Sequence, residues 1–198
     1  MVKDNIQENL VHTGRALIAD KGAEFLTARK LSEASGYSVG TIYNQFGNMD
    51  NYILIQNYLT LESLYHRLKE AKKDVNAYEQ LQRYADTFYT FVLQNKNFWY
   101  LVYTFHLKNN DKHFSVTYLR RISEILLLLD AAFCRLYPTL KAPRRIISLQ
   151  ILWVSFFSLS AFFTTNALNR FTKMDQQKIP ELLLSTYLTG LKVLEKMR

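Results

Sequence analysis

The sequence predicts an all-α protein, and three observations support this prediction. The chain has 198 residues, 48% of them hydrophobic and 21% charged, so it can bury a sizeable core. It holds only six glycines and three prolines, which are too few for the many turns of an all-β fold. No segment alternates polar and apolar residues for long, whereas apolar residues recur with the helical period along most of the chain.

Glycines divide the amino-terminal part into short helices, since five of the six lie in the first fifty residues. The first helix is predicted over residues 4–21 and ends at Gly22, where a left-handed cap is wanted. Thr27 can cap a second helix, which Gly36 ends, and Ser38 can cap a third. This part therefore reads as a small module of three helices, placed in residues 1–50.

Longer helices are expected in residues 51–198. One begins after Gly47 and runs over residues 49–73. The others are expected over 75–96, 98–108, 112–137, 141–169 and 176–197. All three prolines lie after residue 137, and Pro180 falls where a first helical turn tolerates proline. The sequence thus predicts a second, larger helical domain.

Composition narrows the classes of function. Cys134 is the single cysteine, so no internal disulfide can form and a reducing compartment is expected. The amino terminus carries acidic residues and no apolar segment of signal-peptide length, which favours a cytoplasmic protein. The four histidines have no metal-ligand spacing, so we expect no metal, no cofactor and no catalytic residues. The net charge is +8, yet the first fifty residues hold five basic and six acidic residues, so DNA binding there must be argued from spacing.

Residues 28–46 carry the functional signal. They read ARKLSEASGYSVGTIYNQF, which is a helix, a glycine turn and a second short helix whose apolar positions face the first. In a helix–turn–helix motif the second helix lies in the DNA major groove, and its exposed residues touch base edges and phosphates. The residues expected on this exposed face are Ser38, Val39, Gly40, Thr41, Asn44 and Gln45.

The same segment resembles the TetR family of transcriptional regulators over about the first sixty residues. The family turn commonly runs Gly-Val-Ser-x-Gly-Thr-Leu-Tyr-x-x-Phe, and residues 36–46 of this chain read GYSVGTIYNQF. The resemblance implies that Ile42 and Phe46 lie in the core. It implies phosphate contacts from Thr27, Ser38 and Tyr43, and base contacts from Arg29, Val39, Gly40, Thr41 and Asn44.

Four residues depart from the family pattern: Gly14, Ser32, Tyr37 and Met49. Met49 matters most, because many members have a lysine there that approaches a phosphate at the start of the fourth helix. Its loss is expected to weaken DNA affinity and to lower the dependence of affinity on salt.

The larger domain is expected to bind a small apolar or aromatic effector, because its helices are rich in aromatic residues and an apolar pocket with a few polar groups would suit such a ligand. The candidate pocket residues are Phe91, Trp99, Tyr103, His106, Tyr118, Trp153 and Phe157.

Stripes of small and apolar residues in the last two helices suggest a partner helix, and the TetR resemblance implies that these helices pair with their copies in a two-fold homodimer. The candidate interface residues are Ser148, Ser155, Ser158, Leu183, Tyr187, Gly190, Leu191 and Leu194.

These features together indicate a non-enzymatic, ligand-responsive repressor that binds double-stranded operator DNA with a palindromic sequence. Two alternatives use other features of the chain. The segment Gly36-Tyr37-Ser38-Val39-Gly40 fits the nucleophile elbow of a serine hydrolase, although no strand is predicted before it. Residues 146–169 carry no charge over 24 residues, which is long enough for a membrane span, although polar residues interrupt the run.

Overall fold

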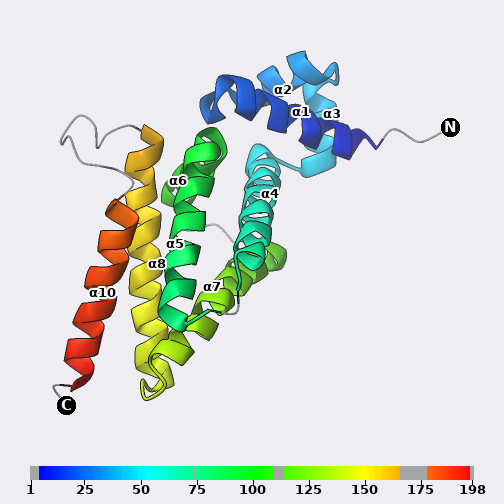
Figure 1. Cartoon of the computed structure of the whole chain (residues 1–198). Coiled ribbons are helices and arrows are strands. Elements are labelled where there is room, and N and C mark those ends of the chain that lie inside the picture. Colours follow the sequence, from blue (N-terminus) through cyan, green and yellow to red (C-terminus); the bar gives the residue numbers. More distant parts are fainter. Residues whose placement is uncertain (1–4, 74, 109–113, 166–177, 197–198) are drawn as a thin grey trace. The chain divides into compact units, whose positions relative to one another are not determined.

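The structure is a computed structural model that describes residues 5–73, 75–108, 114–165 and 178–196 (Figure 1). Within these ranges every regular element is a helix, which confirms the predicted all-α class. The elements are α1 (Ile6–Lys21), the short 3-10 helix η1 (Ala23–Phe25), α2 (Ala28–Ser35), α3 (Val39–Phe46), α4 (Met49–Glu70), α5 (Ala77–Gln94), α6 (Lys96–Lys108), α7 (Val116–Leu136), α8 (Ala142–Thr165) and α10 (Ile179–Lys196).

The helix ends agree closely with the predicted ones, and the differences have local causes. The short helix η1 was not predicted, because three residues are too few to show a helical period. The predicted 112–137 helix begins at Val116, where Ser115 Oγ accepts a hydrogen bond from the Tyr118 N–H at 3.2 Å and caps the first turn. The helix ends predicted at residues 4, 112, 169, 176 and 197 lie outside the described residues.

The chain forms two compact units. One holds the residues up to Glu62 together with Asn95–Leu119, and the other holds Ser63–Gln94 together with the residues from Arg120 onward. In the first unit α6 packs against α1 and η1, so this unit extends beyond the three amino-terminal helices. The division into a DNA-binding domain of residues 1–50 and a ligand-binding and dimerisation domain of residues 51–198 stays a prediction.

Helices α1 to α4 and α6 share the core of the first unit. Its buried members are Leu10, Ile18, Leu26, Leu31, Ile42, Phe46, Tyr52 and Leu101. Tyr52 connects α4 to α1, because its hydroxyl donates to the Leu10 carbonyl at 2.7 Å and accepts from Gln56 Nε2 at 3.0 Å. A Cβ atom on Gly14 would lie 1.8 Å from this hydroxyl, so the absence of a side chain at Gly14 makes room for Tyr52.

Arg15 links three helices of the first unit. Its guanidinium donates to the Gln56 carbonyl at 3.1 Å and to Thr60 Oγ1 at 2.9 Å, both in α4, and its Cζ lies 3.7 Å from the centre of the Phe98 ring in α6. Burial lowers the pKa of Arg15 to about 10, so the side chain stays charged at neutral pH. Asn97 adds a bond from α6 to the Ala19 carbonyl at 3.2 Å.

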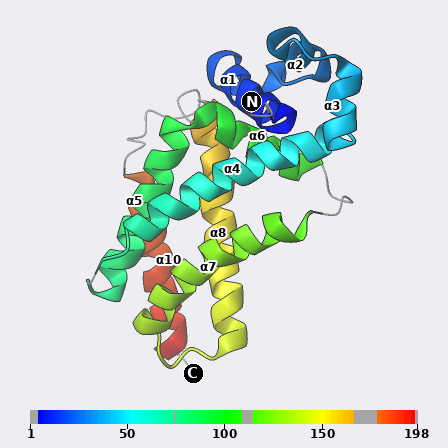
Figure 2. The ribbon, with the colours of Figure 1, turned by 90° about the vertical axis from the view of Figure 1, so that its right-hand side faces the viewer.

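The second unit is a helical bundle in which α5 packs against both α8 and α10. Helices α8 and α10 lie side by side and run in opposite directions (Figures 1 and 2). Leu152 and Phe156 of α8 and Leu188 of α10 are buried in this bundle. Leu152 and Phe156 lie about one turn apart, so they share the face of α8 that is buried in the bundle.

Helix α8 also has an exposed apolar side. By length and composition it could cross a membrane, with a mean hydropathy of 1.9 over its most apolar window. Its buried residues face the bundle, whereas Ile147, Ile151 and Val154 are each more than half exposed. The high hydropathy of α8 therefore has two sources: a core face and a second apolar face that no described residue of the chain covers.

Candidate DNA-binding surface

The two helices of the predicted motif are delimited by side-chain caps and by glycines. Thr27 Oγ1 accepts a hydrogen bond from the Lys30 N–H at 3.2 Å at the start of α2, and Ser38 Oγ accepts from the Thr41 N–H at 3.0 Å at the start of α3. Gly36 ends α2 in the left-handed region, with a φ of 75°, and Gly47 ends α3 with a φ of 77°. The turn and the helix after it are therefore fixed by short-range interactions.

Burial orients α3. Ile42 and Phe46 lie in the core of the first unit, as the resemblance implied, and the Phe46 ring meets the Tyr52 ring edge to face at 4.8 Å between centres. The opposite side of α3 is left to solvent. On it lie the exposed residues Val39, Gly40, Tyr43, Asn44 and Gln45, together with the half-buried Thr41, and the exposed Thr27, Arg29 and Ser38 precede them.

The two capping hydroxyls keep a hydrogen for another acceptor. A hydroxyl that accepts a backbone N–H still has one O–H to donate, and a phosphate oxygen is a suitable acceptor. The Ser38 and Thr41 hydroxyl oxygens lie 2.9 Å apart, and either hydroxyl can donate the hydrogen bond between them. A bound anion at Ser38 would thus select the arrangement in which Thr41 donates to Ser38.

Gly40 is the second residue of α3, and neither its backbone conformation nor the packing around it requires glycine. Its φ is not positive, and a Cβ atom there would meet only Ser38 Oγ, at the ordinary contact distance of 3.6 Å. Glycine costs about 0.5–1 kcal/mol relative to alanine within a helix. The missing side chain leaves the backbone of this helix end open to solvent.

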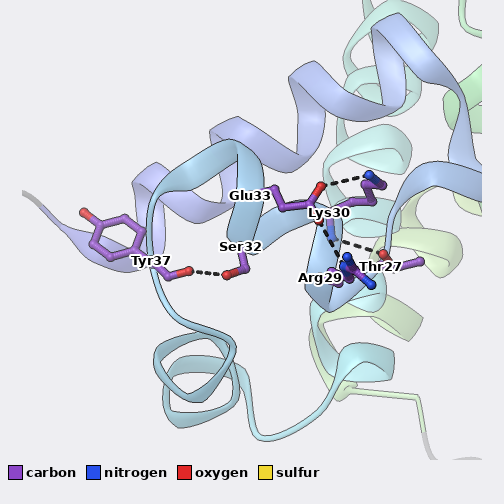
Figure 3. Close-up of polar contacts among 6 residues, drawn as sticks. All are labelled: Thr27, Arg29, Lys30, Ser32, Glu33 and Tyr37. Atoms are coloured by element: carbon purple, nitrogen blue, oxygen red, sulfur yellow. Dashed lines mark hydrogen bonds and ion pairs between the residues drawn. The ribbon is translucent and has the colours of Figure 1, made fainter.

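Arg29 and Lys30 share one carboxylate (Figure 3). Arg29 Nε lies 3.1 Å from Glu33 Oε1, and Lys30 Nζ lies 2.8 Å from Glu33 Oε2. The bonds from Lys30 and Arg29 lower the pKa of Glu33, so it stays ionised at neutral pH. Lys30 and Glu33 were not among the predicted site residues, although Glu33 follows Lys30 by three positions and Arg29 by four, which is the spacing of ion pairs on a helix.

Two departures from the family pattern are joined in the structure. Ser32 Oγ donates to the Tyr37 carbonyl at 2.6 Å, which ties α2 to the turn (Figure 3). The Tyr37 side chain is half-buried and packs against the core cluster of the first unit. The serine therefore adds a bond to the turn that alanine could not form, and the tyrosine adds apolar contact.

Met49 begins α4 and lies against the same core cluster. The start of α4 is capped by Asn48, whose Oδ1 accepts from the Asn51 N–H at 2.8 Å, and Asn51 Nδ2 donates to the Phe46 carbonyl at 3.1 Å. The methionine thus contributes packing where a lysine would contribute charge.

The serine hydrolase alternative is inconsistent with this geometry. A nucleophile elbow needs a strand immediately before the serine, whereas Ser38 follows helix α2 and caps helix α3.

Residues 10–51 match the family model described as bacterial regulatory proteins of the tetR family. Residues 10–51 therefore resemble the amino-terminal domain of TetR-family proteins. The match includes α2, the turn and all of α3, so eight of the nine residues singled out for DNA contact lie in capped or exposed positions of a TetR-family helix–turn–helix, and the ninth, Thr41, is half-buried. No curated protein sequence matches the chain significantly.

Solved structures share the fold over nearly the whole chain. The fatty acid degradation regulator FadR from Bacillus halodurans is 14% identical, with a TM-score of 0.68 over 92% of this chain and 98% of that one. FadR from Bacillus subtilis, in complex with stearoyl-CoA, is 16% identical, with a TM-score of 0.69 over 92% and 98%. The TetR family regulator PfmR from Thermus thermophilus is 17% identical, with a TM-score of 0.64 over 95% and 99%. The chain therefore has a TetR-like fold.

The candidate ligand residues fall in both units. Trp99, Tyr103, His106 and Tyr118 belong to the first unit, and Phe91, Trp153 and Phe157 belong to the second. In the second unit the Trp153 ring stacks with Phe157 at 6.4 Å and meets Phe88 edge to face at 5.8 Å. Trp99 and Phe91 are buried in the packing of their own units. The assignment of these seven residues to one pocket stays a prediction.

His106 and Tyr118 form a partly buried polar pair within the first unit. Their Nε2 and Oη atoms lie 2.8 Å apart, and the Phe114 ring stacks on both side chains. Burial lowers the pKa of His106, so the ring is neutral at pH 7, and burial raises the pKa of Tyr118. This pair was predicted from sequence only as two separate ligand candidates.

Proposed function

We propose that the chain is a homodimeric repressor that binds palindromic operator DNA through residues 27–50 and releases it when a small effector binds. The observation that carries this proposal is the exposed side of α3. There Gly40, at a position where the fold would accept alanine, lies among hydroxyl and amide side chains. Ser38 and Tyr43 suit phosphate oxygens, and Asn44 suits the edge of adenine.

An open groove between α8 and α10 supports the homodimer. It has a volume of about 720 Å³, and five of the eight candidate interface residues line it: Ser148, Tyr187, Gly190, Leu191 and Leu194. Exposed apolar residues of α8, such as Ile147 and Ile151, extend the same surface. A Cβ atom on Gly190 would meet nothing within 4 Å, so the chain itself does not require glycine there. A second copy of α8 and α10 would cover this face and bring two reading helices to a palindrome.

The three remaining interface candidates are not among the residues that line the groove. Ser155 is half-buried and bonds to the Ile151 carbonyl within α8, Ser158 is exposed, and Leu183 is half-buried. Tyr187 joins the two helices by donating to the Ser148 carbonyl at 2.6 Å.

The effector is proposed to be small and apolar or aromatic. The second unit has an apolar cavity of about 40 Å³ beside Phe88 and Trp153, and a ligand could enlarge it by shifting side chains. The related fold of Bacillus subtilis FadR, solved with stearoyl-CoA, is consistent with an apolar ligand in such a bundle. We further propose that the regulator acts in the cytoplasm.

The test is selection of bound fragments from genomic DNA, followed by measurement of affinity for the selected site by fluorescence anisotropy. Thr41→Ala and Tyr43→Ala are expected to abolish specific binding while circular dichroism stays unchanged. Thr117→Ala, an exposed threonine in α7, is the matched control and should bind as the parent does. Equal affinity in all three variants would refute the assignment of α3 as the reading helix.

The dimer has a separate test. Gly190→Leu is expected to give monomers in analytical ultracentrifugation, because the larger side chain would hold two copies of α10 apart. Thr189→Leu, on the neighbouring exposed position outside the groove, should stay dimeric. A dimer in both variants would exclude this face as the interface.

A further inference from the structure

The second unit contains a second, more polar pocket that the proposed contacts do not use. It has a volume of about 320 Å³ and lies between the end of α4, the start of α5 and the middle of α7. Its lining combines the two cations Lys72 and Arg135 with an apolar floor from α7. Pockets of this size hold small organic ligands.

The two cations are held at the pocket by the turn after α4. Buried Gln80 fixes this turn, since its side chain accepts from the Lys73 N–H at 2.8 Å and donates to the Ala71 carbonyl at 3.3 Å. Lys72 lies between these two residues. Arg135 Nη2 donates to the Val75 carbonyl at 3.4 Å, which leaves its other N–H groups available to a ligand.

The charge of the lining is positive. Glu124 is the acidic residue among those that line the pocket, and it is paired with Arg121 at 2.7 Å and with Arg120 at 3.7 Å. Within the described part of the chain, neither Lys72 nor Arg135 has an acidic partner within 4 Å. Among the described residues, the pocket therefore offers two cations that have no carboxylate within 4 Å.

The floor of the pocket is apolar. Leu127 is 63% exposed, and it lies with Leu128, Ala131 and Ala132 on one side of α7. Tyr84 forms the inner wall and also lines the apolar cavity beside Phe88 and Trp153. A ligand in the pocket would therefore meet both cations and apolar surface.

We propose that this pocket binds an amphipathic anion, with its carboxylate between Lys72 and Arg135 and its apolar body against α7 and Tyr84. A guanidinium and an ammonium bind a carboxylate by charge-assisted hydrogen bonds, and burial of the apolar body adds affinity that a small inorganic anion would lack. As a statement about the effector, this inference rests on the proposed ligand response. It refines that proposal, because an apolar ligand without a negative charge would leave both cations unused.

The test compares three probes of one chain length: octanoate, 1-octanol and octylamine. Binding of each labelled probe to the full chain without DNA is measured by equilibrium dialysis. Octanoate is expected to bind at least about tenfold more tightly than the other two, because only octanoate can form the charge-assisted bonds. Equal binding of octanoate and octanol, or no binding of octanoate, would overturn the inference.

Four variants locate the site. Lys72→Gln and Arg135→Gln are each expected to weaken octanoate binding by about tenfold. Lys69→Gln and Arg83→Gln, which remove exposed cations of the same unit outside the pocket, should leave it unchanged. If all four variants bind octanoate equally, the anion does not lie between Lys72 and Arg135.

A final measurement separates this inference from the proposed repression. If octanoate binds in the pocket and operator affinity does not change, the ligand site stands and the proposed ligand response fails. If the chain binds operator DNA and octanoate does not bind, the ligand site fails and the proposed DNA binding stands.

Discussion

Replacing Gly40 by alanine should stabilise the protein and weaken its binding to DNA. The added Cβ atom would meet Ser38 Oγ at 3.6 Å and no other atom within 4 Å, so the substitution creates no clash inside the chain. Alanine is more favourable than glycine in a helix by about 0.5–1 kcal/mol. For a chain of this size that gain raises Tm by about 1–4 °C.

The opposite effect is expected on DNA. A methyl group at the amino end of α3 would keep the backbone of the helix away from the duplex, and a loss of about 1.4 kcal/mol would weaken binding about tenfold. Calorimetry and fluorescence anisotropy on the same preparation measure the two effects. An unchanged affinity would show that Gly40 does not approach DNA, and a lower Tm would show that the internal packing argument is wrong.

Gly36→Ala is the matched control. A Cβ atom at Gly36 would also meet nothing within 4 Å, but the φ of 75° is unfavourable for alanine by about 1 kcal/mol. This variant should lose stability, whereas Gly40→Ala gains it. Comparing the two variants thus distinguishes a glycine that the backbone conformation requires, Gly36, from a glycine that only a bound molecule would require, Gly40.

Three further predictions address other positions. Met49→Lys should add a phosphate contact and steepen the slope of log K against log salt by about 0.9 per contact, and an unchanged slope in a salt titration would contradict this. Gly14→Ala should destabilise the fold by about 1–3 kcal/mol in urea unfolding, because its Cβ would lie 1.8 Å from the Tyr52 hydroxyl, and Tyr52→Phe in the same chain should recover part of the loss. The pKa of His106 is lower in the folded protein than its ordinary 6.5, so protons bind preferentially to the unfolded chain and stability should fall as pH drops below about 6.5. His106→Gln should flatten this dependence in urea unfolding between pH 8 and 5. The same pH dependence in both proteins would refute the assignment to His106.

Features that depend on neighbouring residues were predictable from the sequence. The ends of α2 and α3 follow from Thr27, Ser38, Gly36 and Gly47, because caps and left-handed glycines act within one helical turn. The outward positions on α3 follow from helical spacing once its apolar residues are assigned to the core.

Features that depend on distant residues were not predictable. The bond from Tyr52 to the Leu10 carbonyl joins residues 42 positions apart, and only the fold shows that Gly14 makes room for it. The pocket near Lys72 and Arg135 is likewise formed by three helices, and no spacing along one segment indicates it. For the same reason the aromatic residues proposed as ligand contacts could be identified as apolar but not assigned to one cavity.

The contacts of Arg15 determine where the chain can be cut to make a fragment or a fusion protein. Its guanidinium contacts three groups: the Gln56 carbonyl, the Thr60 hydroxyl and the Phe98 ring. A fragment cut after residue 50 would remove all three and also the Tyr52 hydroxyl bond. A chimaera that joins the first three helices to another domain should therefore carry α4 at least as far as Thr60 and supply an aromatic side chain in place of Phe98.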